Sequence, residues 1–323
     1  MKRLSLSLAA VLLAPYAYLQ AQTVTTTDPL GYVAFPITAG TAAAPSTTLL
    51  SIPLQDENAL RVSVAQALSG TEVKIANVEW AAGEWTDPDA PAYLRVLSGA
   101  QAGATRAIVG NTADSLTLDS ALAGVGVGDL AEIVSAATLG NLFGDTLLGG
   151  ASARESDNIV TADGATYYYN SERGRWERDT DPNVSQDEVI LRPDTGFFLV
   201  RRGPAFQLIS AGRVPITAAR TLVANQGASL ITYGFPADVT IGQLALQNAI
   251  PGWRSHANAA SADWLSIHGG YSYLVYYHTG TNWRRTTGAP TNRDSIVIKA
   301  GTPLLLTRGA APGSAEYTKA KPY

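Results

Sequence analysis

Cysteine is absent from this chain of 323 residues, so no disulfide can stabilise its fold in any compartment. Lysine and arginine number 23 against 27 acidic residues, and the net charge of −4 gives no basic surface of the kind that binds nucleic acid. Beyond the N-terminal segment, no apolar run reaches the roughly 18 residues that a membrane-spanning helix needs. We therefore expect no nucleic-acid partner and no transmembrane segment in the mature chain.

The first 21 residues have the order of a secretory signal peptide. Lys2 and Arg3 are positively charged, an apolar stretch follows over residues 4–14, and Ala21 offers a cleavage position before Gln22. The apolar stretch is too short to span a bilayer. We expect export by this signal peptide, with the mature protein extracellular or in the cell envelope, in the periplasm or on the outer surface.

Two parts of the chain resemble each other at a fixed offset of 107 residues. The offset aligns Trp176 with Trp283, Asp187 with Asp294, residues 189–191 with 296–298, residues 197–199 with 304–306, and Arg201 with Arg308. β-Branched and aromatic residues dominate the matched runs, which predicts strands in the same register. Residues 167–170 match 275–278 if the next loop is one residue shorter in the second copy, and the tetrad 36–39 resembles 215–218.

The first copy contains an insertion. From the tetrad to the matched segments at 138 and 240 the chain takes 102 residues in the first copy and 25 in the second. Short runs separated by Gly, Asn and Asp in this extra segment predict a small β-barrel-like module. Short helices are expected at 62–68, 138–143 and 240–248.

The predicted fold class is mainly β, with two related β-sandwich or barrel-like repeats, short helices and the inserted module. The predicted organisation is a signal peptide at 1–21, repeat one at 22–71 plus 137–205, the inserted β module at 72–136, repeat two at 206–309 and a C-terminal tail at 310–323.

Catalytic residues form no recognisable pattern. The chain has no Gly-x-Ser-x-Gly motif, and its histidines at 256, 268 and 278 match no zinc spacing. The acidic pairs Asp87 with Asp89 and Glu172 with Glu177 leave hydrolysis of an extracellular polysaccharide open. We expect a protein that is not an enzyme and has no cofactor.

One acidic loop places oxygen ligands at alternate positions, as a calcium ion requires. The candidate ligands are Asp179, Asp181, Asn183 and Asp187. The loop departs from a calcium-binding loop at Val184, where a glycine would make the turn. A polar hairpin loop with side-chain-capped turns is the alternative.

Aromatic residues concentrate on one predicted hairpin in each copy. They are Tyr167, Tyr168, Tyr169 and Trp176 in the first, and Tyr273, Tyr276, Tyr277 and Trp283 in the second. Because successive strand side chains face opposite sides, some of the tyrosines should be exposed and could stack on a sugar ring or a protein partner. The alternative places both tryptophans in the core. We expect an exported non-catalytic structural or surface-interaction protein whose partner is an extracellular protein or polysaccharide, or alternatively a carbohydrate-binding protein.

Several short motifs together point to one family. They are Thr-Asp-Pro-Leu-Gly-Tyr-Val at 27–33, the Gly-Ala-Gln-Ala-Gly run at 99–103, Ser-Asp-Asn-Ile at 156–159 and the closing Lys-Pro-Tyr at 321–323. In these motifs the chain resembles an uncharacterised paralogous family of secreted verrucomicrobial proteins. The resemblance implies export and this architecture, and it implies no catalytic residue because the family has no established activity.

Overall fold

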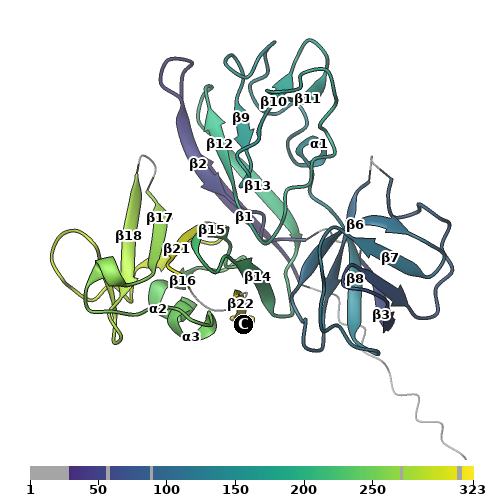
Figure 1. Ribbon diagram of the computed structural model, residues 1–323. Helices are drawn as coiled ribbons and strands as arrows, with labels where there is room; N and C mark the ends of the chain where they lie inside the picture. Colours follow the sequence, from purple (N-terminus) through teal and green to yellow (C-terminus); the bar gives the residue numbers. More distant parts are fainter. Residues whose placement is uncertain (1–28, 56–58, 88–89, 270–271, 311–314) are drawn as a thin grey trace, which may run out of the picture.

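The computed structural model describes residues 29–55, 59–87, 90–269, 272–310 and 315–323, so the predicted signal peptide lies outside the described residues. The fold is mainly β with few short helices, as the sequence predicts. Figure 1 shows three lobes. We call them the copy-one lobe (29–55 and 137–213, top), the barrel (59–135, right) and the copy-two lobe (214–323, lower left). In the part of the chain that the structure describes, no helix is long and apolar enough to cross a membrane.

The copy-one lobe is built on a five-stranded antiparallel sheet in the order β11-β10-β9-β12-β2. Its strands are β2 (Ser46–Leu50), β9 (Asn158–Val160), β10 (Thr166–Asn170), β11 (Arg175–Arg178) and β12 (Phe197–Arg201). A separate two-stranded ribbon pairs β1 (Leu30–Ile37) with β13 (Phe206–Arg213).

Helix α1 (Leu139–Phe143) forms where the sequence predicts a helix and packs on the sheet of the copy-one lobe. Thr138 Oγ1 accepts the N–H of Asn141 at 3.1 Å, and Asn141 Oδ1 accepts the N–H of Thr138 at 2.7 Å. This capping box satisfies donors that the first turn leaves free. The ring of Phe143 then lies 5.8 Å from that of Trp176 and 6.0 Å from that of Phe197, at the centre of the lobe's core.

The copy-two lobe has a five-stranded sheet in the order β15-β21-β17-β18-β19. Its strands are β15 (Gly227–Ile231), β17 (Trp264–His268), β18 (Tyr273–His278), β19 (Trp283–Arg285) and β21 (Leu304–Arg308). The ribbon β14 (Ala219–Val223) with β22 (Ala315–Lys319), the pair β16 (Val239–Thr240) with β20 (Val297–Ile298), and the 3-10 turn η1 (Ala259–Ser261) complete the lobe. The helix expected at 240–248 is two short helices, α2 (Ile241–Leu244) and α3 (Leu246–Ala249), because Ala245 has a left-handed φ of 50°.

Equivalent hydrogen bonds recur in the two sheets. The N–H of Trp176 donates to Asp187 Oδ1 at 2.8 Å, and the N–H of Trp283 donates to Asp294 Oδ1 at 2.8 Å. The ribbons β1–β13 and β14–β22 also begin and end the two lobes in the same way. The two sheets therefore share their strand order, and the offset of 107 found in the sequence holds from β11 to β12 and from β19 to β21.

Two details of the sequence alignment are wrong. Tyr169 pairs with Trp176 seven positions later, whereas His278 pairs with Trp283 five positions later, so the loop is two residues shorter in the second copy rather than one. The tetrads are not equivalent either, because residues 36–37 lie inside β1 while residues 215–218 precede β14.

The inserted module is a closed antiparallel barrel in the order β3-β4-β7-β6-β5-β8, as the sequence predicts. Its strands are β3 (Ala59–Ala67), β4 (Glu72–Ile75), β5 (Ala92–Val96), β6 (Thr105–Asn111), β7 (Ser115–Leu118) and β8 (Leu130–Ser135). Strand β8 pairs with both β3 and β5, which closes the barrel around its own apolar core.

The barrel begins earlier than expected, so the predicted boundary at residue 72 and the predicted helix at 62–68 were wrong. Residues 59–67 form β3, which pairs with β8 and β4. Val62 and Val64 are buried in the barrel core, and Ser63 between them is not. This alternation has the period of two that defines a strand.

The C-terminal segment is not a tail, which corrects the expectation for 310–323. Residues 315–319 form β22 and pair with β14 over five positions. Ala315 and Tyr317 point into the core of the copy-two lobe, and the Tyr317 hydroxyl donates to the carbonyl oxygen of Leu244 at 3.2 Å. The end of the chain is therefore part of the lobe's packing.

The copy-one and copy-two lobes contact each other, and one pair of touching residues, Gly196 and Pro303, is equivalent under the offset. A Cβ on Gly196 would lie 2.4 Å from Cγ of Pro303, its counterpart, so only glycine allows this approach. Thr232 Oγ1 also donates across the contact to the carbonyl oxygen of Pro193 at 3.0 Å. Contact between equivalent residues is the mark of an arrangement close to two-fold symmetry.

Candidate functional site

The aromatic residues of the two hairpins lie mostly inside the protein. Tyr167, Tyr168, Trp176, Tyr276, Tyr277 and Trp283 are buried, and Tyr169 and Tyr273 are half-buried. The expectation of a flat exposed aromatic platform is therefore wrong for both hairpins. Successive rings on β10 do face opposite sides of the sheet, but charged side chains and loops cover the outer side.

Glu177 on β11 closes that outer side. Its carboxylate accepts hydrogen bonds from the Tyr168 hydroxyl at 3.0 Å, Asn170 Nδ2 at 2.9 Å, Arg173 Nη1 at 3.0 Å and Arg175 Nε at 2.9 Å. Burial opposes ionisation of this carboxyl, but the hydrogen bonds outweigh it and lower the pKa of Glu177 to about 2. A carboxyl with this pKa is ionised at neutral pH, so Glu177 cannot supply the proton that hydrolysis with Glu172 would need.

Asp157 anchors the other end of the same sheet and is fully buried. Its Oδ2 accepts the N–H of Leu148 at 2.8 Å, its Oδ1 accepts the N–H of Arg202 at 2.5 Å, and it forms an ion pair with Arg201. The partners come from two parts of the sheet's frame, because residue 148 follows α1 and residues 201–202 lie at the end of β12, while Asp157 itself directly precedes β9. The carboxylate therefore fixes three segments to one another.

Asp263 repeats this arrangement in the copy-two lobe. Its Oδ2 accepts the N–H of Arg254 at 3.0 Å, its Oδ1 accepts the N–H of Gly309 at 3.0 Å, and Arg308 Nε lies 3.5 Å from Oδ2. Asp157 lies in the Ser-Asp-Asn-Ile motif at 156–159, but the sequence alone predicts no role for either aspartate. Their signal was the recurrence of an aspartate before a matched strand and of an arginine at the end of another.

Asp187, one of the four predicted calcium ligands, uses one carboxylate oxygen to bond β11 and the other to bond its own loop. Oδ1 accepts the N–H of Trp176, and Oδ2 accepts the Ser185 hydroxyl at 2.7 Å. Asp179, Asp181 and Asn183 are exposed. Among the described residues no three His, Asp or Glu side chains are grouped as a metal site requires. Asp187 thus has a structural role without a cation, and calcium at this loop stays a prediction.

Replacing Asp187 with alanine is expected to lower the free energy of unfolding by about 1 to 3 kcal/mol, because the N–H of the buried Trp176 loses its acceptor. Asp294→Ala should have a similar effect in the copy-two lobe, while Asp179→Ala should change little. Urea denaturation with and without EDTA measures these differences. An EDTA effect on the wild-type protein as large as the Asp187→Ala effect would instead assign the loop to calcium.

Ser255 and His278 are brought together in the copy-two lobe, which the sequence analysis did not anticipate. The Ser255 hydroxyl lies 2.9 Å from His278 Nδ1, which also accepts the N–H of Gly280 at 3.3 Å. Burial lowers the pKa of His278, so its ring is neutral near pH 7. In the described part of the chain no carboxylate hydrogen-bonds this ring, so the pair lacks the orienting acid of a hydrolytic triad. The acidic pair Asp87 and Asp89 stays untested because Asp89 lies outside the described residues.

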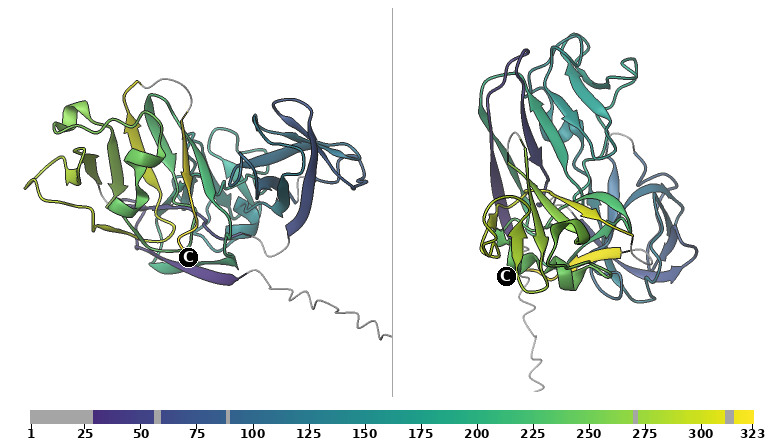
Figure 2. Two further views of the ribbon diagram at one scale, coloured as in Figure 1. Left: turned by 90° about the horizontal axis from the view of Figure 1, so that it is seen from below. Right: turned by 60° about the vertical axis from the view of Figure 1, so that its left-hand side comes forward.

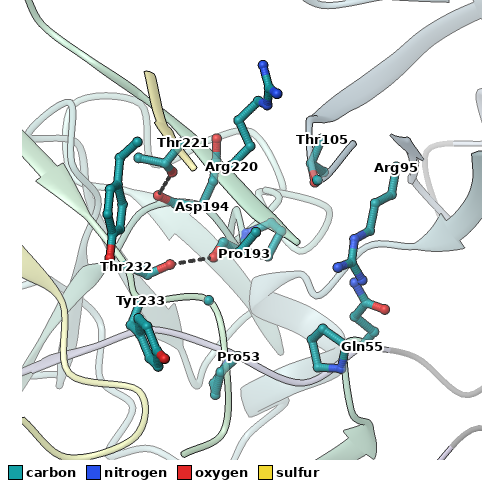
Figure 3. A pocket seen from close by; sticks show the side chains of 15 residues that line it. Pro53, Gln55, Arg95, Thr105, Pro193, Asp194, Arg220, Thr221, Thr232 and Tyr233 are labelled. Atoms are coloured by element: carbon teal, nitrogen blue, oxygen red, sulfur yellow. Dashed lines mark hydrogen bonds between the residues drawn. The ribbon is translucent and has the colours of Figure 1, made fainter. Parts of the chain in front are cut away.

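The three lobes meet around a small cavity (Figure 3). Its lining includes Arg95 and Thr105 from the barrel, Pro53, Gln55, Pro193 and Asp194 from the copy-one lobe, and Arg220, Thr221, Thr232 and Tyr233 from the copy-two lobe. The cavity volume is about 40 Å³, which suits one or two water molecules rather than a substrate. Arg95 Nη2 donates to Thr217 Oγ1 at 2.9 Å, and Arg213 Nη1 donates to Glu132 Oε2 at 2.8 Å nearby. These contacts make the region a structural junction.

Two further cavities have the size of small-ligand sites, at about 370 and 310 Å³. The larger lies between the barrel and the copy-one lobe, where Tyr93 and Asn141 contribute to its wall. The amide of Asn141 is already used, because Oδ1 caps α1 and Nδ2 donates to the Ala136 carbonyl oxygen at 2.9 Å. The smaller cavity lies beside β10 and is lined by Tyr167 and Phe197.

The ribbon of β1 and β13 presents large apolar side chains to solvent. Leu30 is 62% exposed, Tyr32 74% and Ile209 58%. Pairing places Tyr32 opposite Ala211 and Ala34 opposite Ile209, so these side chains share one side of the ribbon, which we call the ribbon face. Figure 2 shows β1, in purple, along the outer surface of the molecule. Leu30 and Tyr32 belong to the family-like motif at 27–33, and the sequence alone does not predict that they are exposed.

Comparison with known proteins adds no functional information. No protein family matches the chain, and no curated protein matches it. A solved structure of the CUB1-EGF-CUB2 domains of rat MASP-1 aligns over 90% of this chain and 97% of its own length, with 9% sequence identity and a TM-score of 0.12. A likeness this small does not establish a shared fold, and the function must be argued from the residues.

Proposed function

We propose that this protein is exported and works without catalysis, by holding an extracellular protein partner on the ribbon face. The observation that carries the proposal is the group of Leu30, Tyr32 and Ile209, three large apolar side chains exposed together on one side of a two-stranded ribbon. Contiguous exposed apolar surface on a water-soluble lobe marks an interaction site more often than chance. Export is proposed from the order of residues 1–21.

The charged groups support a structural rather than a catalytic use of the interior. Asp157, Glu177 and Asp263 are buried and each is held by arginine and by backbone or side-chain donors. A catalytic acid or base needs a pKa near the working pH and access to substrate, and Glu177 has neither. We propose no catalytic residue in this chain.

A protein partner is favoured over a polysaccharide by the chemistry of the ribbon face. Sugar binding relies on aromatic rings that lie flat at the surface, and the two aromatic hairpins bury theirs. The ribbon face instead offers aliphatic side chains beside one tyrosine, which is the composition of the centre of a protein interface. The carbohydrate-binding alternative thereby loses the residues on which it was based.

The double variant Tyr32→Ser with Ile209→Ser is expected to bind cell envelopes at least roughly tenfold more weakly than the wild-type mature protein, because interface energy concentrates in a few large side chains. The measurement is the amount of purified protein that sediments with envelopes from producing cells in which its gene is deleted. Protease treatment of the envelopes should also abolish binding.

The matched control is Leu222→Ser with Val297→Ser, which removes two exposed apolar side chains from the copy-two lobe. This control should bind as the wild type does. Equal binding by all three proteins would refute the ribbon face as the interaction surface. Binding that survives protease but not removal of envelope glycans would replace the protein partner with a polysaccharide.

A further inference from the structure

The smaller of the two ligand-sized cavities lies beside β10 in the copy-one lobe and has a volume of about 310 Å³. Its apolar wall is formed by Val189, Leu191, Phe197 and the ring of Tyr167. Asp163 and Arg192 stand at its polar side. None of these residues belongs to the ribbon face, so the cavity is a separate feature of the lobe.

Tyr167 brings a polar group to this apolar wall. Its side chain is only 7% exposed, and its hydroxyl has no hydrogen-bond partner among the described residues. Two other buried tyrosines have paired hydroxyls: Tyr168 donates to Glu177, and Tyr317 donates to the carbonyl oxygen of Leu244. The hydroxyl oxygen is not one of the fully buried polar atoms that lack a partner in the described residues, so solvent reaches it and a ligand in the cavity can hydrogen-bond it in place of water.

The side chains that line the cavity carry a negative charge; Arg178, which pairs opposite Tyr167 and also acts on Asp163, lies outside this lining. The hydroxyl of Thr161 donates to Asp163 Oδ1 at 2.6 Å, and this bond lowers the pKa of Asp163 and keeps the carboxyl ionised. The positive charge of Arg192 is already taken by Asp119 at 2.6 Å and Asp194 at 3.1 Å. An anionic ligand would therefore meet repulsion, whereas a hydroxyl or ammonium group would find acceptors.

The equivalent place in the copy-two lobe is built differently. There the hairpin β17–β18 continues for two more pairs, and Ile267 and Leu274 pack against the core around Tyr276. In the copy-one lobe β9 and β10 separate after Val160 and Thr166, and a short turn takes their place. The shorter hairpin leaves the apolar wall beside Tyr167 open in the first copy.

We propose that this cavity binds a small molecule that combines a ring-shaped apolar body with hydroxyl or ammonium groups. The apolar body lies against Val189, Leu191 and Phe197. One polar group hydrogen-bonds the Tyr167 hydroxyl, and a second faces the Asp163 carboxylate. The proposal is independent of the ribbon face, because it assigns a ligand and not a macromolecular partner.

Three probes with one ring system and different charge test the proposal: tyramine, tyrosol and 4-hydroxyphenylacetate. Isothermal titration or ligand-observed NMR with the full mature chain should show saturable binding of the cation and of the neutral alcohol, and about tenfold or more weaker binding of the anion. Asp163→Asn should remove the preference for tyramine over tyrosol. No saturable binding of tyramine or tyrosol below about 10 mM, a weak limit for so small a ligand, overturns the proposal.

Tyr167→Phe removes one oxygen and keeps the buried ring, so the fold should persist, as circular dichroism can confirm. The expected result is a Kd for tyrosol raised about 3- to 10-fold, the effect of one lost hydrogen bond. Tyr168→Phe is the matched control, since its hydroxyl is on the other side of the same strand and bonds Glu177. Equal affinities of wild type and Tyr167→Phe, or equal weakening in both variants, would show that the cavity is not the binding site.

Discussion

Replacing Asp157 with asparagine is expected to lower the free energy of unfolding by about 3 to 5 kcal/mol, the range for breaking a buried ion pair from one side. Arg201 is buried and would keep its charge without its partner. The new amide group would also face the N–H groups of Leu148 and Arg202, which now donate to the carboxylate. Urea denaturation followed by tryptophan fluorescence measures the loss.

Asp263→Asn is the matched variant in the copy-two lobe, and we expect a smaller loss there. Its closest charged partner is Arg254, whose side chain is 44% exposed, and its buried partner Arg308 lies at 3.5 Å. An exposed partner that loses its carboxylate is solvated by water, which reduces the penalty. Asp179→Asn, at an exposed position, should change stability by less than about 0.5 kcal/mol. A loss below about 1 kcal/mol for Asp157→Asn would contradict the anchoring role.

Local signals in the sequence were sufficient for the main elements of the fold. Residues 197–199 and 304–306 are alike in composition and spacing, and they lie on the equivalent strands β12 and β21. Thr138 precedes α1 with the residue types of a capping box, and the helix forms there. Such features depend on residues within a few positions of one another. A short run that recurs in both copies therefore predicts the same element in each copy.

Elements that depend on distant partners were predicted wrongly. Residues 62–68 allow either a helix or a strand. Pairing with β8, far along the chain, at residues 62–63 and with β4 from residue 64 to residue 67 decides for the strand. Residues 315–319 contain alternating apolar side chains within a segment rich in Ala, Gly and Lys, and pairing with β14 orders them. Tertiary pairing of this kind overrides local composition.

The aromatic hairpins were also predicted wrongly because their exposure depends on contacts that the sequence does not show. Strand alternation correctly places Tyr167 and Tyr168 on opposite faces of β10, but it cannot tell whether an outer face is open. The sequence contains Glu177, the acidic residue that covers this face. It does not show that the side chains of Arg173 and Arg175 fold back onto the Glu177 carboxylate. Exposed aromatic surface was therefore expected where a charged network covers the rings.

Through this charged network, the stability of the folded protein depends on pH by way of the ionisation of Glu177. The pKa of Glu177 lies at about 2 in the folded protein against an ordinary value of 4.5. A depressed carboxyl pKa contributes stability above pH 4.5, and the contribution is lost as the pH falls from 4.5 towards 2. Because Arg173 is half exposed and partly screened by water, we expect the contribution to be about 1 to 3 kcal/mol at neutral pH.

Glu177→Gln should therefore be less stable than the wild type by this amount at pH 7, and the difference should shrink to near zero as the pH approaches 2. Urea midpoints at pH 7, 4.5, 3 and 2 for both proteins give the comparison. Glu172→Gln is the control, because Glu172 is exposed in the adjacent loop and should follow the wild-type curve at every pH. A Glu177→Gln curve that stays parallel to the wild-type curve down to pH 2 would mean that the four donors hold the hairpin together without depending on the charge of Glu177.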